Sequence, residues 1–238
     1  MSTFLLIRHG QASLGAADYD VLSPLGVVQA RRVGAHLARL IDPPAAIYSG
    51  PLRRQRDTAT HLVAAAREAG VDFPDPIVEP AFDEYPALAI MQRQLKRMLA
   101  DDELGPHLGH LAAQVRGSLE YRRAFETAFQ HVMRHWHDER LADPEIEAHA
   151  AFQARVERAI LELFDRHGRG ATILATTSAG PVGVGLKLGL GTDSWSGLKA
   201  SFVVANASIT ELKSRGEAPT LTMFNALPHL DRREITLR

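Results

Sequence analysis

The chain has 238 residues, which is enough for one large α/β domain with a substantial core or for two small domains. A net charge of −1 argues against a nucleic-acid or anionic-membrane surface that acts through bulk charge, and the lack of cysteine excludes disulfides, thiolate catalysis and cysteine metal sites. No apolar run approaches the length of a membrane span, so we expect one cytoplasmic domain over residues 1–238.

The first predicted element is a buried strand over residues 4–7, which runs into the polar turn Arg8-His9-Gly10-Gln11. In open α/β sheets, ligands bind outside the carboxyl ends of the strands. Arg8 offers a planar fork of donors suited to phosphate or carboxylate, and His9 is able to act as base, acid or nucleophile near neutral pH. Gly10 lets the backbone come close to a bound group. We therefore place the candidate site at this strand end.

The next elements alternate between helix and strand. Ser23 reads as an N-cap and Pro24 as the first residue of a helix that runs to about residue 41. A short buried strand over residues 45–49 then ends at Gly50-Pro51. The same reading predicts a second helix over residues 52–68 and a short strand over residues 76–79.

Residues 86–149 differ in composition from the rest of the chain, and we interpret them as a helical insertion over the sheet that serves as a lid or partner surface. Candidate helices cover residues 88–100 and 119–137, and Gly105-Pro106 separates them. Phe125, Phe129, Val132 and Trp136 form an apolar stripe on the second helix. Exposed apolar residues on this insertion would allow a homodimer.

The remaining sequence returns to alternating helix and strand. A helix over residues 151–166 precedes a third core strand, residues 171–175, and Pro181 opens another helix after the turn at 176–180. Strands are predicted near residues 201–205, 208–213 and 220–224. The whole pattern predicts a three-layer α/β/α sandwich with a mostly parallel central sheet and a helical insertion.

Two stretches resemble signatures of the histidine phosphatase superfamily, the phosphoglycerate mutase-like proteins. Arg8-His9-Gly10 at the end of the first strand is similar to the first signature, and residues 49–59 resemble the second, a serine-led turn followed by an arginine and a Thr-Ala pair. The arginine of that pattern falls on Arg54. The tail stretches at residues 206–210 and 224–230 also resemble the family, so the similarity covers the whole chain except the insertion.

The resemblance implies that His9 is a nucleophile that forms a phosphohistidine, without a metal ion or cofactor. Arg8 and Arg54 would neutralise the phosphate, and Gln11 would join them in binding it. Alone, the arginines at positions 53, 54 and 56 would be read as a solvated helix face. Behind an Arg-His-Gly strand, Arg54 is predicted to lie in the site.

The leaving alcohol needs a proton, and the resemblance assigns this step to a glutamate after the second helix. The segment here reads Phe82-Asp83-Glu84, so we take Glu84 as the general acid. Asp83 is the competing candidate, because position alone separates the two carboxyl groups.

The turn after the third core strand departs from the family pattern, which usually has a second histidine there. That position holds Ser178, followed by Ala179, and we expect both to contribute to phosphate binding. A hydroxyl still donates a hydrogen bond, but a positive charge has gone. Loss of one such donor typically costs on the order of 10²–10³ in rate.

Three functions follow from these residues. The first is hydrolysis of a small phosphomonoester, the second is mutase-type phosphoryl transfer, and the third is binding of a phosphorylated ligand without turnover. His131 and His135 have a spacing that could hold a metal, but no clear third ligand accompanies them. The arginines at 53–56 have too few aromatic neighbours to indicate a nucleic-acid partner.

Overall fold

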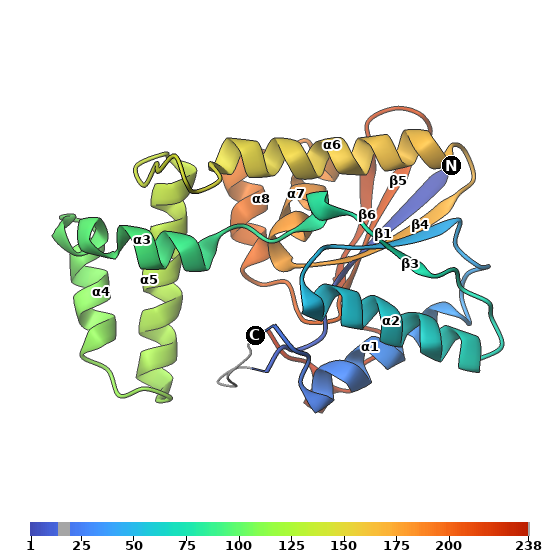
Figure 1. The fold of residues 1–238 in the computed structure, drawn as a ribbon, viewed down its shortest axis with the longest axis horizontal. Helices are drawn as coiled ribbons and strands as arrows, with labels where there is room; N and C mark the ends of the chain where they lie inside the picture. Colours follow the sequence, from blue (N-terminus) through green and yellow to red (C-terminus); the bar gives the residue numbers. More distant parts are fainter. Residues whose placement is uncertain (14–19, 238) are drawn as a thin grey trace. The chain divides into compact units, whose positions relative to one another are not determined.

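A computed structural model describes residues 1–13 and 20–237 of the chain. Its internal contacts divide it into two compact units. The first, Met1–Glu84 with Arg155–Arg238, contains the sheet and is called the sheet unit; the second, Tyr85–Ala154, is called the helical unit. Figure 1 follows the chain through both units by colour.

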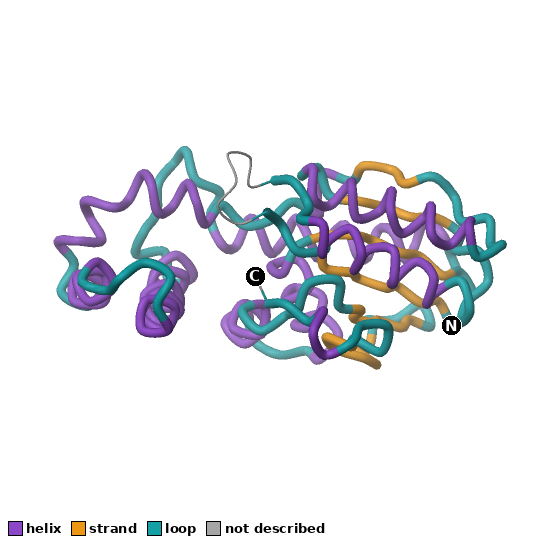
Figure 2. The backbone as a smooth tube through the Cα atoms, turned by 90° about the horizontal axis from the view of Figure 1, so that it is seen from below, coloured by secondary structure: helices purple, strands orange, loops and turns teal. Residues whose placement is uncertain are grey.

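The sheet unit is built on six strands in the order β3-β2-β4-β1-β5-β6. Figure 2 shows the strands in orange and the helices in purple. Strands β3, β2, β4 and β1 pair in parallel, whereas β5 pairs antiparallel with both β1 and β6. The mostly parallel sheet is therefore confirmed. The strands are β1 Ser2–Arg8, β2 Ala46–Ser49, β3 Pro76–Val78, β4 Thr172–Thr177, β5 Ile209–Ser214 and β6 Thr220–Ala226.

Helices cover both faces of this sheet, as the predicted three-layer sandwich requires (Figure 1). Helices α1 and α2 pack together on one face, and α6 and α7 lie on the other. The elements are α1 Pro24–Leu37, α2 Arg53–Glu68, η1 Pro80–Phe82, α6 His149–His167, α7 Ala179–Leu190, α8 Ser194–Ser201 and η2 Arg232–Glu234.

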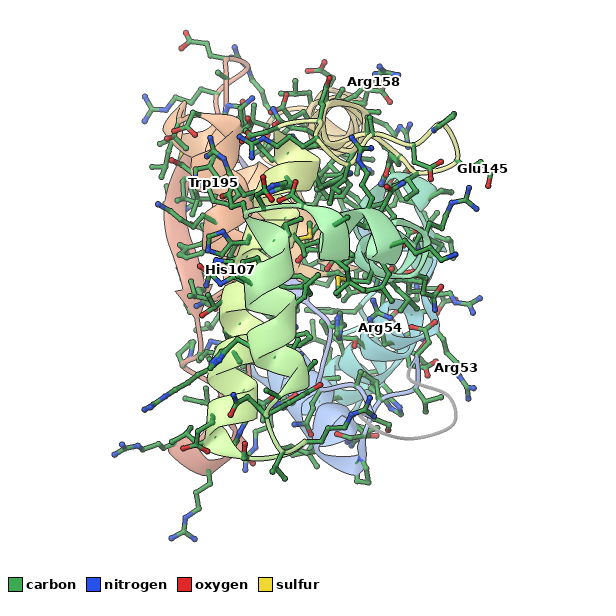
Figure 3. The ribbon with its side chains drawn as sticks, turned by 90° about the vertical axis from the view of Figure 1, so that its left-hand side faces the viewer. Arg53, Arg54, His107, Glu145, Arg158 and Trp195 are labelled. Atoms are coloured by element: carbon green, nitrogen blue, oxygen red, sulfur yellow. The ribbon has the colours of Figure 1, made fainter. Side chains whose placement is uncertain are left out.

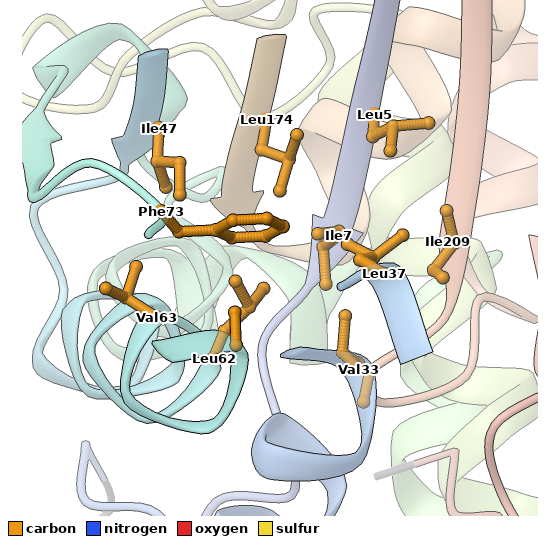
Figure 4. Close-up of a cluster of buried hydrophobic side chains, with 12 residues drawn as sticks. Leu5, Ile7, Val33, Leu37, Ile47, Leu62, Val63, Phe73, Leu174 and Ile209 are labelled. Atoms are coloured by element: carbon orange, nitrogen blue, oxygen red, sulfur yellow. The ribbon is translucent and has the colours of Figure 1, made fainter. Parts of the chain in front are cut away.

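Strand β1 is apolar on both faces because both faces are covered. Leu5 and Ile7 join a buried cluster with Leu62 of α2, and Phe73 fills the space between that helix and the strands (Figure 4). On the opposite face, the ring of Phe4 packs edge-on against Phe164 of α6, with 5.7 Å between ring centroids. Packing on both sides fixes the strand that carries the candidate nucleophile.

The helical unit contains α3 (Ala87–Ala100), α4 (Leu104–Ala112), α5 (Leu119–His137) and the start of α6. The ring of Trp136 on α5 packs against Tyr85 and Phe152, with centroids 5.9 and 6.0 Å away. The sequence did not predict α4. Gly105 and Pro106 were read as a break, but they lie in its first turn, where proline is tolerated.

Two predictions in the sheet unit were wrong, namely the end of the first helix and one strand. Helix α1 ends at Leu37 rather than Ile41, and tighter turns follow it before the exposed Leu40. Residues 201–205 were predicted as a strand, but Ser201 is the last residue of α8 and the chain then turns. Val204 in that stretch is buried, so its apolar pattern reflects burial rather than strand pairing. Among the described residues, no helix is long and apolar enough to span a membrane.

Candidate active site

The carboxyl ends of the parallel strands meet at one edge of the sheet, where the candidate residues lie. His9 follows β1, and its backbone N–H donates to the carbonyl of Thr177 at the end of β4, 2.8 Å away. Gly50 follows β2 and donates to Thr176, 2.9 Å away, so α2 begins beside the same edge. The register pairs Arg8 with Thr177, so His9 and Ser178 are the residues that directly follow the paired ends of the two strands.

His9 is 4% exposed, and the contacts of its imidazole define its tautomer. Nδ1 lies 2.7 Å from the carbonyl oxygen of Gly10, which accepts only, so Nδ1 carries the proton. Nε2 then holds a lone pair, and it accepts a hydrogen bond from Nε of Arg54 at 3.1 Å. Burial, helped by the charges of Arg8 and Arg54, holds the pKa of His9 well below its usual value. The ring is therefore neutral at pH 7 with Nε2 able to attack.

The guanidinium of Arg54 contacts His9 through one nitrogen and Asp20 through another. Its Nη1 pairs with Oδ1 of Asp20 at 2.7 Å, while Oδ2 of Asp20 accepts the backbone N–H of Arg53 at 2.7 Å. Asp20 thus caps the first turn of α2 and aligns the guanidinium beside His9. The side chain of Arg53 is 54% exposed and pairs with Asp57, so the two neighbouring arginines differ in environment (Figure 3).

Arg8 is buried and is held by backbone oxygens. Its Nη1 donates to the carbonyl of Leu237 at 2.6 Å and to that of Val204. Gln11 lies on the α1 side of the loop, where its Oε1 accepts a hydrogen bond from Ser23 at 2.8 Å. Arg8 lies close enough to His9 for its charge to lower the pKa of the imidazole.

Ser178 is completely buried and is bonded to a residue that the sequence analysis passed over. Oε1 of Gln55 accepts the backbone N–H of Leu52 at 3.0 Å, which fixes the orientation of the amide. Nε2 of Gln55 therefore faces Ser178 and donates to its Oγ at 2.9 Å. Ala179, the next residue, is the first of α7 and is buried. Gln55 directly follows Arg54 in the stretch that resembles the second signature, and this position in the sequence is the signal that could have pointed to it.

The two carboxyl groups after η1 have different partners. Oε1 of Glu84 accepts the backbone N–H of Gly180, 3.0 Å away, in the first turn of α7. Oδ1 of Asp83 instead accepts the backbone N–H of Glu84 at 2.7 Å. Glu84 thus reaches the turn that follows Ser178, whereas Asp83 bonds locally.

The histidines of α5 form a separate cluster. His131 stacks on His107 with 3.9 Å between centroids, and Nδ1 of His135 lies 3.1 Å from the carbonyl of His131. Over residues 1–13 and 20–237, no group of three or more potential ligand side chains has a geometry that could hold a metal ion.

Comparison with solved structures supports the fold. The chain is 18% identical to a phosphoglycerate mutase from Bacillus anthracis, with a TM-score of 0.66 over 96% of this chain and 94% of that one. It is 19% identical to a phosphoserine phosphatase from Entamoeba histolytica, with a TM-score of 0.60 over 96% and 99% of the two chains. A mycobacterial glucosyl-3-phosphoglycerate phosphatase gives 19% identity and a TM-score of 0.59 over the same shares.

A family model connects the sequence to these folds. None of the curated proteins compared with the chain matches it. The model of the histidine phosphatase superfamily, branch 1, matches residues 4–100 and 107–227, which include both signature stretches and most of the helical unit. The chain belongs to branch 1 of the histidine phosphatase superfamily.

Proposed function

We propose that this protein transfers phosphoryl groups through a phosphohistidine on His9, and that its reaction is hydrolysis of a small phosphomonoester. The observation that supports this best is the state of His9: a neutral, buried imidazole whose Nε2 lone pair lies 3.1 Å from Nε of Arg54. A nucleophile needs that lone pair, and the guanidinium beside it supplies positive charge for the phosphoryl oxygens.

The first step forms a bond between Nε2 of His9 and phosphorus. As the phosphorus–oxygen bond to the leaving group breaks, its electron pair goes to the leaving oxygen, which takes the proton of the Glu84 carboxylic acid. In this step Arg54 turns its Nε–H from the imidazole to a phosphoryl oxygen. Water then attacks phosphorus and gives one proton to the Glu84 carboxylate. The bond between phosphorus and Nε2 breaks, its electron pair returns to Nε2, and the products are free phosphate and neutral His9.

The phosphate is bound by groups at the same sheet edge. Arg8 and Arg54 contribute charge, and Gln11, Ser178 and Ala179 complete the proposed binding set. The first turn of α7 adds a helix N-terminus, which favours an anion. We propose a small phosphorylated molecule as the substrate.

A second candidate is binding of a phosphorylated ligand without turnover. Ser178 favours it, because this residue is uncharged, fully buried and bonded to Gln55. A site without the second positive donor would stabilise the transferring phosphoryl group less than one that has it.

The test is hydrolysis of 4-nitrophenyl phosphate in EDTA by wild type and His9→Ala, with His110→Ala as the control for an exposed histidine. We expect His9→Ala to lower kcat/KM by at least about a thousandfold and His110→Ala to leave it unchanged. Acid-labile radiolabel from substrate should appear on wild type and on His110→Ala, and not on His9→Ala. Wild type that binds inorganic phosphate but neither turns over nor takes up label would favour the second candidate.

A further inference from the structure

The segment before Glu84 is fixed through its backbone oxygens. Nη1 of Arg155, on α6, donates to the carbonyl of Ala81 at 2.7 Å and reaches that of Asp83 at 3.4 Å. One guanidinium nitrogen therefore bridges the carbonyl groups of the two residues on either side of Phe82. Glu84 is the next residue after this clamp.

The carbonyl of Phe82, which lies between those of Ala81 and Asp83, has its own donors. It accepts from Oγ1 of Thr177 at 2.8 Å and from Nε2 of Gln55 at 3.1 Å. The ring of Phe82 is fully buried and packs edge-on against Phe4, with centroids 6.0 Å apart. Three successive carbonyls are thus held by side chains from α6, β4 and α2.

These bonds differ in what they can affect. Thr177 and Gln55 lie beside Ser178, so their replacement would disturb the phosphate side of the site as well. Arg155 contacts the segment from α6, and its contacts with Ala81 and Asp83 lie immediately before Glu84. Arg155 is therefore the residue whose change would move the carboxyl group of Glu84 with least effect on His9.

We infer that Arg155 is a positioning residue for proton transfer by Glu84. The inference rests on the proposed function. Arg155 does not exchange the proton: it holds the backbone from which the carboxyl group extends to the leaving oxygen. In its absence, the bond between His9 and phosphorus still forms, but the leaving oxygen departs with less protonation. A misplaced acid loses part of the roughly 10²–10⁴-fold that general acid catalysis supplies.

This role has a kinetic signature that a merely structural role lacks. A leaving group that is already stable as an anion needs little protonation, whereas phenol, with a pKa of about 10, needs much more. The experiment compares kcat/KM of Arg155→Gln for 4-nitrophenyl phosphate and phenyl phosphate. We expect a loss of about 10- to 100-fold for phenyl phosphate and of no more than about threefold for 4-nitrophenyl phosphate.

Further variants complete the test. Arg155→Lys keeps the charge and a donor, so it should restore most of the activity on phenyl phosphate. If Arg155→Gln does not fold, Arg155→Met, which keeps the length of the side chain but has no donor, carries the comparison between substrates. Arg158→Gln is the matched control, because Arg158 is an exposed arginine on the same helix (Figure 3). It should change neither rate.

A double-mutant cycle identifies the group through which Arg155 acts. In a Glu84→Gln background, Arg155→Gln should have no additional effect on phenyl phosphate, because the acid is already gone. Equal losses on both substrates, or independent effects of the two substitutions, would overturn the inference and leave the proposed function in place. Hydrolysis that survives His9→Ala would instead overturn the proposed function.

Discussion

Ser178 and Gln55 must be considered together at the residue scale. The hydroxyl accepts from an amide that is itself fixed by the backbone of Leu52, and both side chains are fully buried. A larger side chain at position 178 would have to displace the amide of Gln55 that contacts it. From sequence alone, Ser178→His would be expected to raise the rate by restoring a positive donor; the packing makes that outcome conditional on Gln55.

We predict that Ser178→His by itself lowers the free energy of unfolding by about 1–3 kcal/mol, because the imidazole overpacks against Gln55. Ser178→His with Gln55→Ala should recover most of that stability and hydrolyse 4-nitrophenyl phosphate faster than Ser178→His alone. Urea unfolding and kcat measure the two effects. A single variant as stable as wild type would contradict the packing argument.

The sequence pointed to the candidate residues His9 and Arg54 more directly than to the residues that hold them in place. His9 and Arg54 lie in recognisable motifs, and the structure brings their side chains into contact. Their partners are distant along the chain: Asp20 is 34 residues from Arg54, and Gln55 is 123 residues from Ser178. Such pairs depend on which side chains the folded sheet brings together, so no local pattern indicates them.

At the element scale, the face of α1 that meets α2 depends on one glycine. A methyl group on Gly34 would collide with the backbone carbonyl of Leu62. This close approach allows Val33 and Leu37 to reach the cluster under β1. The two helices are therefore packed with backbone against backbone at this point.

Gly34→Ala should destabilise the sheet unit by about 1–3 kcal/mol, even though alanine favours helix, because the helices must separate. The control is Val28→Ala on the same helix, where the side chain is 41% exposed. Urea unfolding, together with hydrogen-exchange protection of the β1 amides, measures the stability of both variants. If Gly34→Ala proved as stable as Val28→Ala, the close contact at Gly34 would not set the distance between α1 and α2.

Element prediction succeeded where periodicity was long and failed where it was short. The predicted bounds of α5, 119–137, agree with the structure, because its apolar stripe spans many turns. Helices α4 and α8 were missed; they have only 9 and 8 residues. For the first, a first-turn proline was read as a break, and for the second, a buried apolar run beside it was read as a strand.

At the scale of the whole molecule, buried histidines link stability to pH in both units. Burial lowers the pKa of His229 in the sheet unit to about 4, with His36 and Arg32 adding to the effect and Glu234 opposing it. In the helical unit, burial lowers the pKa of His149 to about 4, helped by His137 and opposed by Asp138.

The sign follows from the unfolded value of about 6.5. As pH falls from 7.5 to 5, the unfolded chain takes up protons that the native histidines refuse, so stability falls. We expect a loss of about 1 kcal/mol for each of the two histidines, after allowance for solvent screening. Urea unfolding of His229→Asn and His149→Gln should show shallower pH dependence than wild type. A dependence as steep as that of the exposed-site control His110→Gln would refute the assignment.

The central position of β1 also bears on protein synthesis. This strand is translated well before its two neighbours, β4, which begins at Thr172, and β5, which begins at Ile209. The ribosome therefore adds α1, α2 and the whole helical unit before the backbone around His9 obtains either partner. Until β4 emerges, the Thr177 carbonyl that holds His9 is missing, so the proposed chemistry waits for strands made long after the residue that would carry it.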